Sequence, residues 1–204
     1  MSALPFPESL CHRCAAPPKY VRTARSTFVL CPLVAEKYPR QPVLACPAYR
    51  PAVIATERLV LRELVPADEP FVASMTDSVA EAADWLRRCF ERYARDGHGF
   101  WLAVERERGD PVGQIGLLSQ TIDGVAEPEV SYHVHARHRG RGFAVEGATA
   151  VRDWAFARGH DHVIALVRED NVASQAVARK LDMQPGGCVM HAGAPHVVWR
   201  VDRR

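Results

Sequence analysis

The spacing of apolar residues in the second half of the chain predicts a strand, a loop and a helix in succession. An alternating segment predicts the strand, helical spacing predicts the helix, and Gly159 stands where a C-terminal cap is expected. The apolar positions are Val130, Tyr132 and Val134 in the strand and Ala148, Val151 and Ala155 in the helix. The loop between them reads Arg137-His138-Arg139-Gly140-Arg141-Gly142.

This loop has the features of an anion-binding site. Gly140 and Gly142 have no Cβ, so successive backbone N–H groups can turn toward one point. The helix N-terminus adds free N–H groups and a partial positive charge, and the neighbouring arginines can add charge-assisted hydrogen bonds. We therefore expect the loop to bind a pyrophosphate.

Two nucleotide-binding motifs of similar outline are excluded. The dinucleotide fingerprint G-x-G-x-x-G requires a glycine at Val145, and the next glycine is Gly147. The phosphate loop G-x-x-x-x-G-K-[ST] is absent. The pattern that fits is (Arg or Gln)-x-x-Gly-x-(Gly or Ala), formed by Arg137, Gly140 and Gly142. It resembles the coenzyme A loop of the GNAT superfamily of N-acetyltransferases.

The flanking segments resemble the same superfamily in the same order, over about three quarters of the chain. They are most similar to the branch of the ribosomal-protein N-terminal acetyltransferases, the RimJ and RimL type. The matching segments are an opening strand TERLVLR (56–62), a helix start at Ala67–Glu69, strands at Phe100–Val104 and Pro111–Leu117, the strand start Glu129–Tyr132, and Asn171-x-x-Ser174 with Val177 and Lys180-Leu181.

The resemblance implies an α/β (α+β) GNAT fold. Its sheet would be mixed and mostly antiparallel, splayed between its fourth and fifth strands, with helices on both faces. Acetyl-CoA would lie in the gap, and a backbone N–H of the fourth strand would stabilise the oxyanion. The implied coenzyme-binding residues are Tyr132, His133, Val134, Arg137, Arg139, Gly140, Arg141, Gly142, Phe143, Ala144 and Asn171.

The same resemblance suggests which groups carry the chemistry. An amine must lose a proton to attack a thioester, and Glu129, at the family's strand-start glutamate, is the first candidate base. His133 and His135 share its side of the strand by period-two alternation and are alternative proton relays; water is a third. Many relatives assist the departing thiolate with a tyrosine, but the aligned residue here is Ala178. The ribosomal-type branch implies Ser174 for this role, with ordinary helix capping by that serine as the alternative.

Two segments depart from the family pattern. Asp182 stands where glycine is expected, and aspartate tolerates a left-handed conformation better than most residues. The loop between the first two helices is short, since Met75–Glu81 leads directly into a helix predicted over Ala82–Arg95. We therefore expect an open acceptor cleft, partly roofed by the N-terminal segment.

Composition agrees with a globular protein. Hydrophobic residues make up 48% and charged residues 25%, close to the average for such proteins. No apolar run approaches the ~18 residues that would span a bilayer. Met1–Leu10 lacks the basic start of a secretory signal. These features predict a cytoplasmic protein without membrane association.

The first fifty residues differ from the rest in charge and proline content. They carry seven Lys or Arg against two Glu, a net of +5, whereas the remainder carries 19 basic and 22 acidic residues, a net of −3. Nine of the fifteen prolines lie at or before Pro51. We predict a small module over residues 1–51 and an acetyltransferase domain over residues 52–204.

Four of the six cysteines lie in this module, at Cys11, Cys14, Cys31 and Cys46. A segment this short cannot bury enough apolar surface to fold unaided, and four thiolates around a structural zinc would supply the missing stability. An iron–sulfur cluster, disulfides or unrelated thiols are the alternatives. The basic charge suits nucleic acid, or simply a solvated face. Cys89 and Cys188 are expected to be packed or idle thiols.

The sequence thus predicts an acetyl-CoA-dependent N-acetyltransferase. It would transfer the acetyl group to a primary amine, of a protein N-terminus or a small molecule, by direct attack in a ternary complex. The alternative is a non-catalytic acetyl-CoA sensor or adaptor, recruited to nucleic acid or protein by the four-cysteine module.

Overall fold

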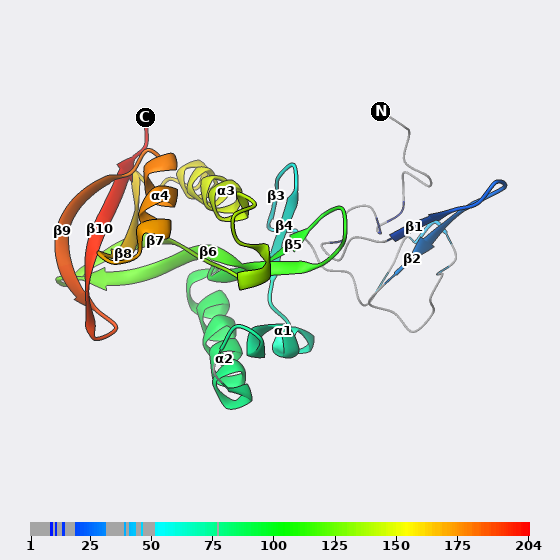
Figure 1. The fold of residues 1–204 in the computed structure, drawn as a ribbon, viewed down its shortest axis with the longest axis horizontal. Helices are drawn as coiled ribbons and strands as arrows, with labels where there is room; N and C mark the ends of the chain where they lie inside the picture. The colour runs from blue at the N-terminus through cyan, green and yellow to red at the C-terminus, as the bar shows by residue number, and fades with distance from the viewer. Residues whose placement is uncertain are drawn as a thin grey trace.

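The computed structural model describes residues 9, 11, 14, 19–31, 39, 41–43, 46, 52–76 and 78–204. Residues 52–204 form an eight-stranded sheet with helices on both faces, as Figure 1 shows. Nearer the N-terminus, β1 (Lys19–Arg22) and β2 (Thr27–Leu30) form an antiparallel hairpin. The predicted fold class is confirmed.

The elements of the sheet and its helices follow one another along the chain. The strands are β3 (Ile54–Ala55), β4 (Leu59–Glu63), β5 (Phe100–Glu105), β6 (Pro111–Ile122), β7 (Val125–Val134), β8 (His162–Arg168), β9 (Gln184–His191) and β10 (Ala194–Asp202). The helices are η2 (Pro66–Asp68), α1 (Glu69–Ala73), α2 (Val79–Asp96), η3 (Ala136–His138), α3 (Phe143–Ala157) and α4 (Val172–Lys180), where η2 and η3 are 3-10 helices.

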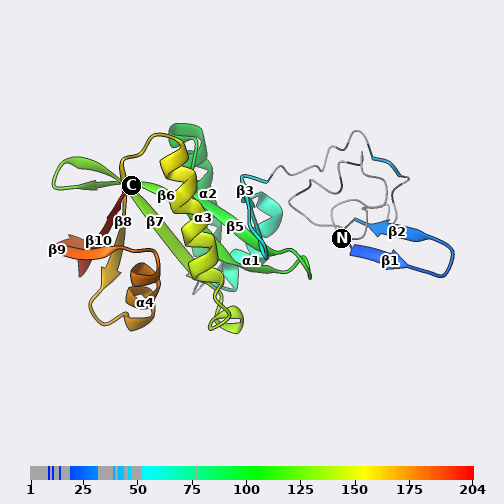
Figure 2. The ribbon, with the colours of Figure 1, turned by 90° about the horizontal axis from the view of Figure 1, so that it is seen from above.

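The strands lie in the order β3-β4-β5-β6-β7-β8-β10-β9. Neighbouring strands are antiparallel except β7 and β8, which are parallel and pair at Glu129 and Ile164. From this pair the two strands diverge (Figure 2), while β7 stays paired with β6 along its whole length. Counted from the predicted opening strand, which corresponds to β4, β7 and β8 are the fourth and fifth strands, so the predicted splay is this divergence.

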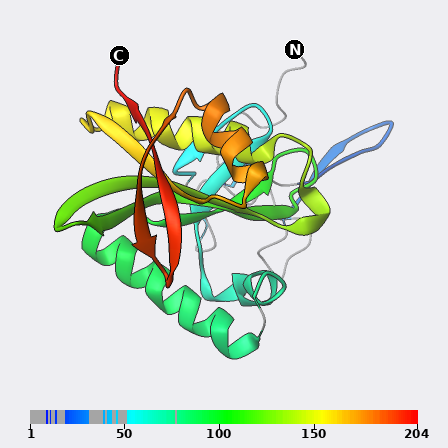
Figure 3. The ribbon, with the colours of Figure 1, turned by 60° about the vertical axis from the view of Figure 1, so that its left-hand side comes forward.

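Each face of the sheet carries its own core. Helices α3 and α4 cover one face, and α1 and α2 cover the other (Figures 1 and 3). Helix α3 packs closely on β6, because a Cβ at Gly147 would stand 2.4 Å from Cδ1 of Ile115. The smallest residue at this position therefore lets α3 approach the sheet, and this helix carries the predicted loop at its N-terminus.

Helix α2 begins at Val79, three residues before the predicted start at Ala82, and ends at Asp96. Ser78 caps α2 by accepting a hydrogen bond from the N–H of Glu81 at 3.2 Å. Gly159 follows α3 at φ +94°, as its predicted cap requires, and Asp182 adopts the left-handed φ of +61°. The connection from α1 to α2 runs only from residue 74 to residue 78, so the short loop is confirmed.

The opening strand is shorter than its motif predicts. Residues 56–58 form a turn between β3 and β4, and the strand begins at Leu59. The side-chain oxygen of Thr56 accepts a hydrogen bond from the N–H of Leu59 at 2.9 Å, which stabilises the turn against an extended conformation. As a result, Arg58 projects toward the loop before α3.

Candidate active site

A cleft of about 750 Å³ opens where β7 and β8 part. Its walls are the C-terminal half of β7, the loop before α3, the start of α4 and the segment after α1. The lining residues are Ser74, Met75, Tyr132, His133, Val134, His135, Ala136, His138, Arg139, Gly140, Gly142, Phe143, Ala144, Val145, Asn171, Ala173, Ser174, Ala176, Val177 and Lys180. The cleft therefore gathers most of the predicted coenzyme-binding residues, along with Ser174.

The predicted anion loop forms one end of the cleft. Gly140 and Gly142 have φ values of +75° and +82°, a backbone conformation that residues other than glycine rarely adopt. Helix α3 begins directly after Gly142, so the unpaired N–H groups of its first turn face the same region. Arg139 lines the cleft, held by a 3.1 Å hydrogen bond from its Nε to the carbonyl of Val134. Backbone amides, a helix N-terminus and one arginine at this end of the cleft are thus available to bind an anion.

The other two arginines of the loop are turned to protein groups. The Nε of Arg137 donates to Nε2 of His138 at 2.9 Å. The guanidinium of Arg141 pairs with the buried carboxylate of Glu105 on β5 and contacts His138 on its other side. Neither arginine is among the residues that line the cleft. Their predicted contact with coenzyme A therefore has no support from the geometry, because partners on β5 and η3 hold them.

Tyr132 joins the two walls of the cleft. Its hydroxyl donates a 3.1 Å hydrogen bond to the carbonyl of Ser174, from β7 across to α4. Burial raises the pKa of Tyr132 to about 12, so the hydroxyl keeps its proton at neutral pH. A protonated phenol here is a fixed hydrogen-bond donor beside the gap between the diverging strands.

Helix α4 presents Asn171 and Ser174 to the cleft. Asn171 is the N-cap residue, and its side-chain oxygen accepts a 3.0 Å hydrogen bond from the N–H of Ser174. Capping by Ser174 is therefore wrong as an alternative role, since Asn171 holds that position. The amide NH₂ of Asn171 still projects from a residue that lines the cleft. Ala178, aligned with the tyrosine of many relatives, is fully buried.

Two histidines, His133 in β7 and His135 directly after it, lie in the cleft wall that faces α1 and α2. The ring of His133 stacks near Phe100 and Trp85, with centroid distances of 5.8 and 6.3 Å, yet remains exposed to the cleft. The surrounding protein, and then Arg139, lower the pKa of His133 below its ordinary value of 6.5. His135 lies 6.0 Å from the ring of Phe71. His133 is thus a neutral imidazole at pH 7, positioned by two aromatic rings.

Glu129 lies at the apex of the splay rather than in the cleft wall. It is 6% exposed and accepts a 2.6 Å hydrogen bond from Nε2 of Gln120. The backbone N–H of Leu166 on β8 also donates to it, just past the point where the strands part. Burial raises the pKa of Glu129 above its ordinary value, despite these two hydrogen bonds. Glu129 therefore lies where the backbone pairing of β7 with β8 stops.

The predicted zinc site finds no support in the structure. All four cysteines of the N-terminal segment are among the described residues, with Cys11 buried and the others partly buried. No group of three or more His, Cys, Asp or Glu in the described part of the chain is arranged to hold a metal ion. No residue described before position 52 lines the cleft, so the proposed roof is likewise unsupported.

The remaining two cysteines are placed as expected. Cys89 is fully buried in α2, and burial raises the pKa of its thiol to about 11. Cys188 is exposed on β9. Both are consistent with packed or idle thiols.

In the described residues, no helix has the length and apolar character needed to cross a bilayer.

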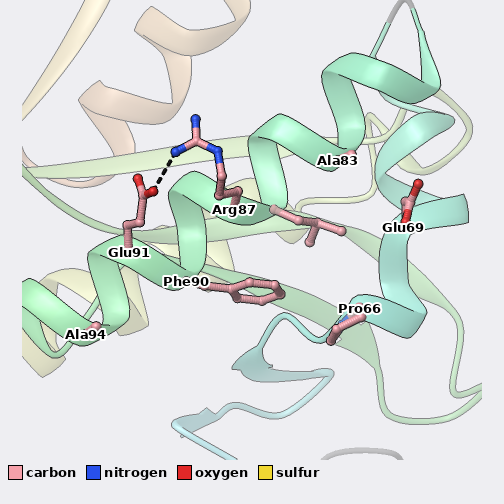
Figure 4. A pocket seen from close by; sticks show the side chains of 8 residues that line it. Pro66, Glu69, Ala83, Arg87, Phe90, Glu91 and Ala94 are labelled. Atoms are coloured by element: carbon pink, nitrogen blue, oxygen red, sulfur yellow. Dashed lines mark hydrogen bonds and ion pairs between the residues drawn. The ribbon is translucent and has the colours of Figure 1, made fainter.

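A second hollow, of about 460 Å³, lies between η2, α1 and α2, away from the cleft. Figure 4 shows Phe90 and Pro66 along it, with the ion pair between Arg87 and Glu91 on α2. It contains no predicted site residue. Most of the predicted site residues line the first cleft instead.

Some residues that contact the candidate site residues or the glycine loop are not predicted from the sequence. Trp85 and Gln120 carried no motif, and only their contacts with His133 and Glu129 reveal them. Arg58 lies within the TERLVLR motif, and Glu146 lies in the first turn of the helix that follows the glycine loop. The contact between Arg58 and Glu146 joins positions 88 residues apart, so no local pattern in the sequence predicts it.

Comparison with known proteins agrees with this geometry. The family model for the acetyltransferase (GNAT) domain matches residues 58–184. The uncharacterized protein YkkB of Bacillus subtilis (strain 168) is 31% identical over 120 residues, which cover 58% of this chain and 68% of that protein.

Solved structures show the same fold. An acetyltransferase from Agrobacterium tumefaciens str. C58 has a TM-score of 0.64 at 26% identity, over 74% of this chain and 94% of that chain. RimL, a ribosomal L7/L12 alpha-N-protein acetyltransferase in complex with coenzyme A, has a TM-score of 0.61 at 17% identity, over 74% and 97%. The chain therefore belongs to the GNAT family and is an acyltransferase of the N-acetyltransferase class.

Proposed function

We propose that this protein transfers the acetyl group of acetyl-CoA to a primary amine by direct attack within a ternary complex. The observation that carries the proposal is the coincidence of two features. The strands β7 and β8 part at Glu129, and the glycine loop with its free amides closes the far end of the resulting cleft. A thioester arm fits the gap, and a diphosphate fits the loop.

The donor would be held by three parts of the cleft. Gly140, Gly142 and Arg139 face the diphosphate, and the edge of β7 that lacks a partner strand offers backbone groups to the pantetheine amides. The side-chain NH₂ of Asn171 binds the same arm from α4. Fixing the thioester in this way supplies much of the acceleration, because the reacting atoms are brought into line.

For the proton acceptor we propose His133, with Glu129 as the alternative. The amine nitrogen forms a bond to the thioester carbon, its proton passes to the imidazole, and the carbon–sulfur bond breaks. His133 lines the cleft and is neutral at pH 7, so it is ready to accept that proton. Glu129, first in the sequence analysis, is enclosed by Gln120 and Leu166 and would need a relay through water.

The departing thiolate would be stabilised from α4. Ser174 lines the cleft on the wall opposite β7, and Tyr132 keeps its proton next to it. A hydrogen bond from the hydroxyl of Ser174 lowers the energy of the leaving sulfur, while Tyr132 donates its proton to the Ser174 carbonyl and holds the two walls together. The acceptor would enter beside Met75 and His133, where the short connection between α1 and α2 leaves the cleft open.

The alternative function is that of an acetyl-CoA sensor or adaptor, and we rank it below the enzyme. A cytoplasmic location and a role for the four N-terminal cysteines likewise stay proposals. Amine-dependent release of coenzyme A thiol separates enzyme from sensor. We expect release to rise at least tenfold over the rate in water when a panel of peptides with free N-termini, lysine and small amines is added. Saturable binding of acetyl-CoA without such release by any amine would favour the sensor.

A further inference from the structure

Glu146 places a negative charge where the proposed donor carries its diphosphate. It lies in the first turn of α3, directly after the glycine loop. The carboxylate accepts hydrogen bonds from Oγ1 of Thr56 at 2.5 Å, from the N–H of Arg58 at 2.8 Å and from Nε of Arg58 at 2.6 Å. Although burial opposes ionisation, these bonds lower the pKa of Glu146, so it is charged at neutral pH.

Arg58 forms an ion pair with the carboxylate of Glu146 and also contacts the glycine loop. Its Nε pairs with Glu146, while its Nη1 donates a 2.9 Å hydrogen bond to the carbonyl of Arg141. Its guanidinium lies 5.0 Å from the centre of the Phe143 ring. A Cβ added at Gly142 would stand 3.3 Å from Nη2 of Arg58. One side chain from the turn before β4 therefore contacts both the loop and the first turn of α3.

The bond to the Arg141 carbonyl sets the direction of the next amide. In a trans peptide the C=O and the following N–H point in opposite directions. With the Arg141 carbonyl held toward Arg58, the N–H of Gly142 points away from it, and Gly142 lines the cleft. The orientation of a diphosphate-binding amide thus depends on a residue outside the loop.

We propose that Arg58, supported by Thr56, is a positioning residue for coenzyme A: it neutralises Glu146 and aims the Gly142 amide at the diphosphate. This inference rests on the proposed function, since it assumes that the loop binds the donor. It also gives a physical role to the TER portion of the opening motif. Arg58 lies behind the loop and acts through it, so its effect falls on the diphosphate end of the donor.

The test compares coenzyme A binding by isothermal titration calorimetry in a set of variants. We expect Arg58→Met to weaken binding about tenfold or more, because it removes a charge-assisted hydrogen bond and leaves Glu146 uncompensated. Adding Glu146→Gln to Arg58→Met should restore part of the affinity. Arg106→Met is the matched control, since Arg106 donates to the Thr56 carbonyl at 2.8 Å in the same turn and is exposed; its affinity should stay within about twofold.

A truncated donor separates positioning from general damage to the fold. Acetyl-pantetheine has no diphosphate, so its kcat/KM should be the same in Arg58→Met and wild type. If Arg58→Met does not fold, Arg58→Lys keeps the charge beside Glu146 without the two-pronged contact, so it should show a smaller loss of coenzyme A affinity, with acetyl-pantetheine again unaffected.

Equal coenzyme A affinity in wild type and the Arg58 variants would overturn the inference, as would an equal loss with both donors. If the wild type itself fails to bind coenzyme A, the proposed function falls, and this inference falls with it.

Discussion

The two ends of the β7–β8 pair show how one strand pair serves structure and chemistry. At the closed end, Glu129 pairs with Ile164, and Glu127 forms an ion pair with His162 across the strands. At the open end, the strands have parted, and the groups there line a cleft of about 750 Å³. The carboxylates at the closed end have protein partners, Gln120 for Glu129 and His162 for Glu127, whereas His133 at the open end faces solvent.

This difference indicates a division of roles along β7. Substitutions at the open end should change donor binding or turnover and leave the free energy of unfolding nearly unaltered. Substitutions at the closed end should change the free energy of unfolding and leave donor binding nearly unaltered. Glu129, at the apex, is the residue at which the two roles meet.

The largest effect is expected from Gly142→Glu at the open end. The substitution puts a side chain at φ +82° and a carboxylate into the anion loop, so acetyl-CoA binding should be lost in titration calorimetry. Gly124→Glu is the matched control, because Gly124 also has φ +82° but lies in the turn between β6 and β7 with nothing near its Cβ position. If the Gly142 variant bound as tightly as the control, the loop would not be the donor site.

His133→Gln should lower kcat by about 100-fold or more while the KM for acetyl-CoA changes little, because a general base is removed without loss of donor contacts. In the wild type, kcat should fall at acidic pH with an apparent pKa below 6.5, since only the neutral imidazole accepts a proton. The pH profile of steady-state rates checks both. An unchanged acidic limb in His133→Gln would move the role to Glu129 or water.

Glu129→Leu should cost about 1–3 kcal/mol of unfolding free energy, because the donors on Gln120 and Leu166 lose their acceptor. Glu129→Gln keeps a side-chain oxygen that accepts hydrogen bonds but cannot ionise, so it shows whether the negative charge of Glu129 raises or lowers the free energy of unfolding. The raised pKa means that the folded state binds the proton more tightly, so wild-type stability from this group is full below about pH 4.5 and is lost as pH rises through the raised pKa.

Urea unfolding at pH 4.5 and pH 7.5 measures this difference. The stability of Glu129→Gln relative to wild type should increase from the lower to the higher pH. A change in the opposite direction would mean that Gln120 and Leu166 outweigh burial, and that Glu129 is stabilised as the carboxylate.

His162→Ala at the closed end should have the smallest effect, about 1 kcal/mol or less, because its pair with Glu127 is partly exposed to solvent. Thermal unfolding with and without acetyl-CoA measures the effect and shows whether donor affinity is retained. A large loss of donor affinity in this variant would contradict the division of roles along β7.

Local features of the sequence predicted the loop and the fold, whereas long-range contacts determined which side chains serve the site. Gly140, Gly142 and the start of α3 follow from a few consecutive residues, and the structure has them as expected. The direction of Arg141 depends on Glu105, 36 residues earlier, and no local pattern reports it.

The same reason explains the change of preference from Glu129 to His133. Alternation along β7 correctly put them on one side of the strand, but alternation does not distinguish a buried apex from an open wall. Gln120 on β6 and the N–H of Leu166 enclose Glu129, while Trp85 on α2 positions His133. These partners come from other elements and appear only once the chain is folded.

Mass spectrometry of a cell extract incubated with the protein and acetyl-CoA labelled in its acetyl group tests the central claim most directly. We expect labelled acetyl groups on primary amines with the wild-type protein and none with Gly142→Glu. Saturable acetyl-CoA binding by the wild type without any labelled amine would contradict the account and indicate a protein that binds the donor without transferring it.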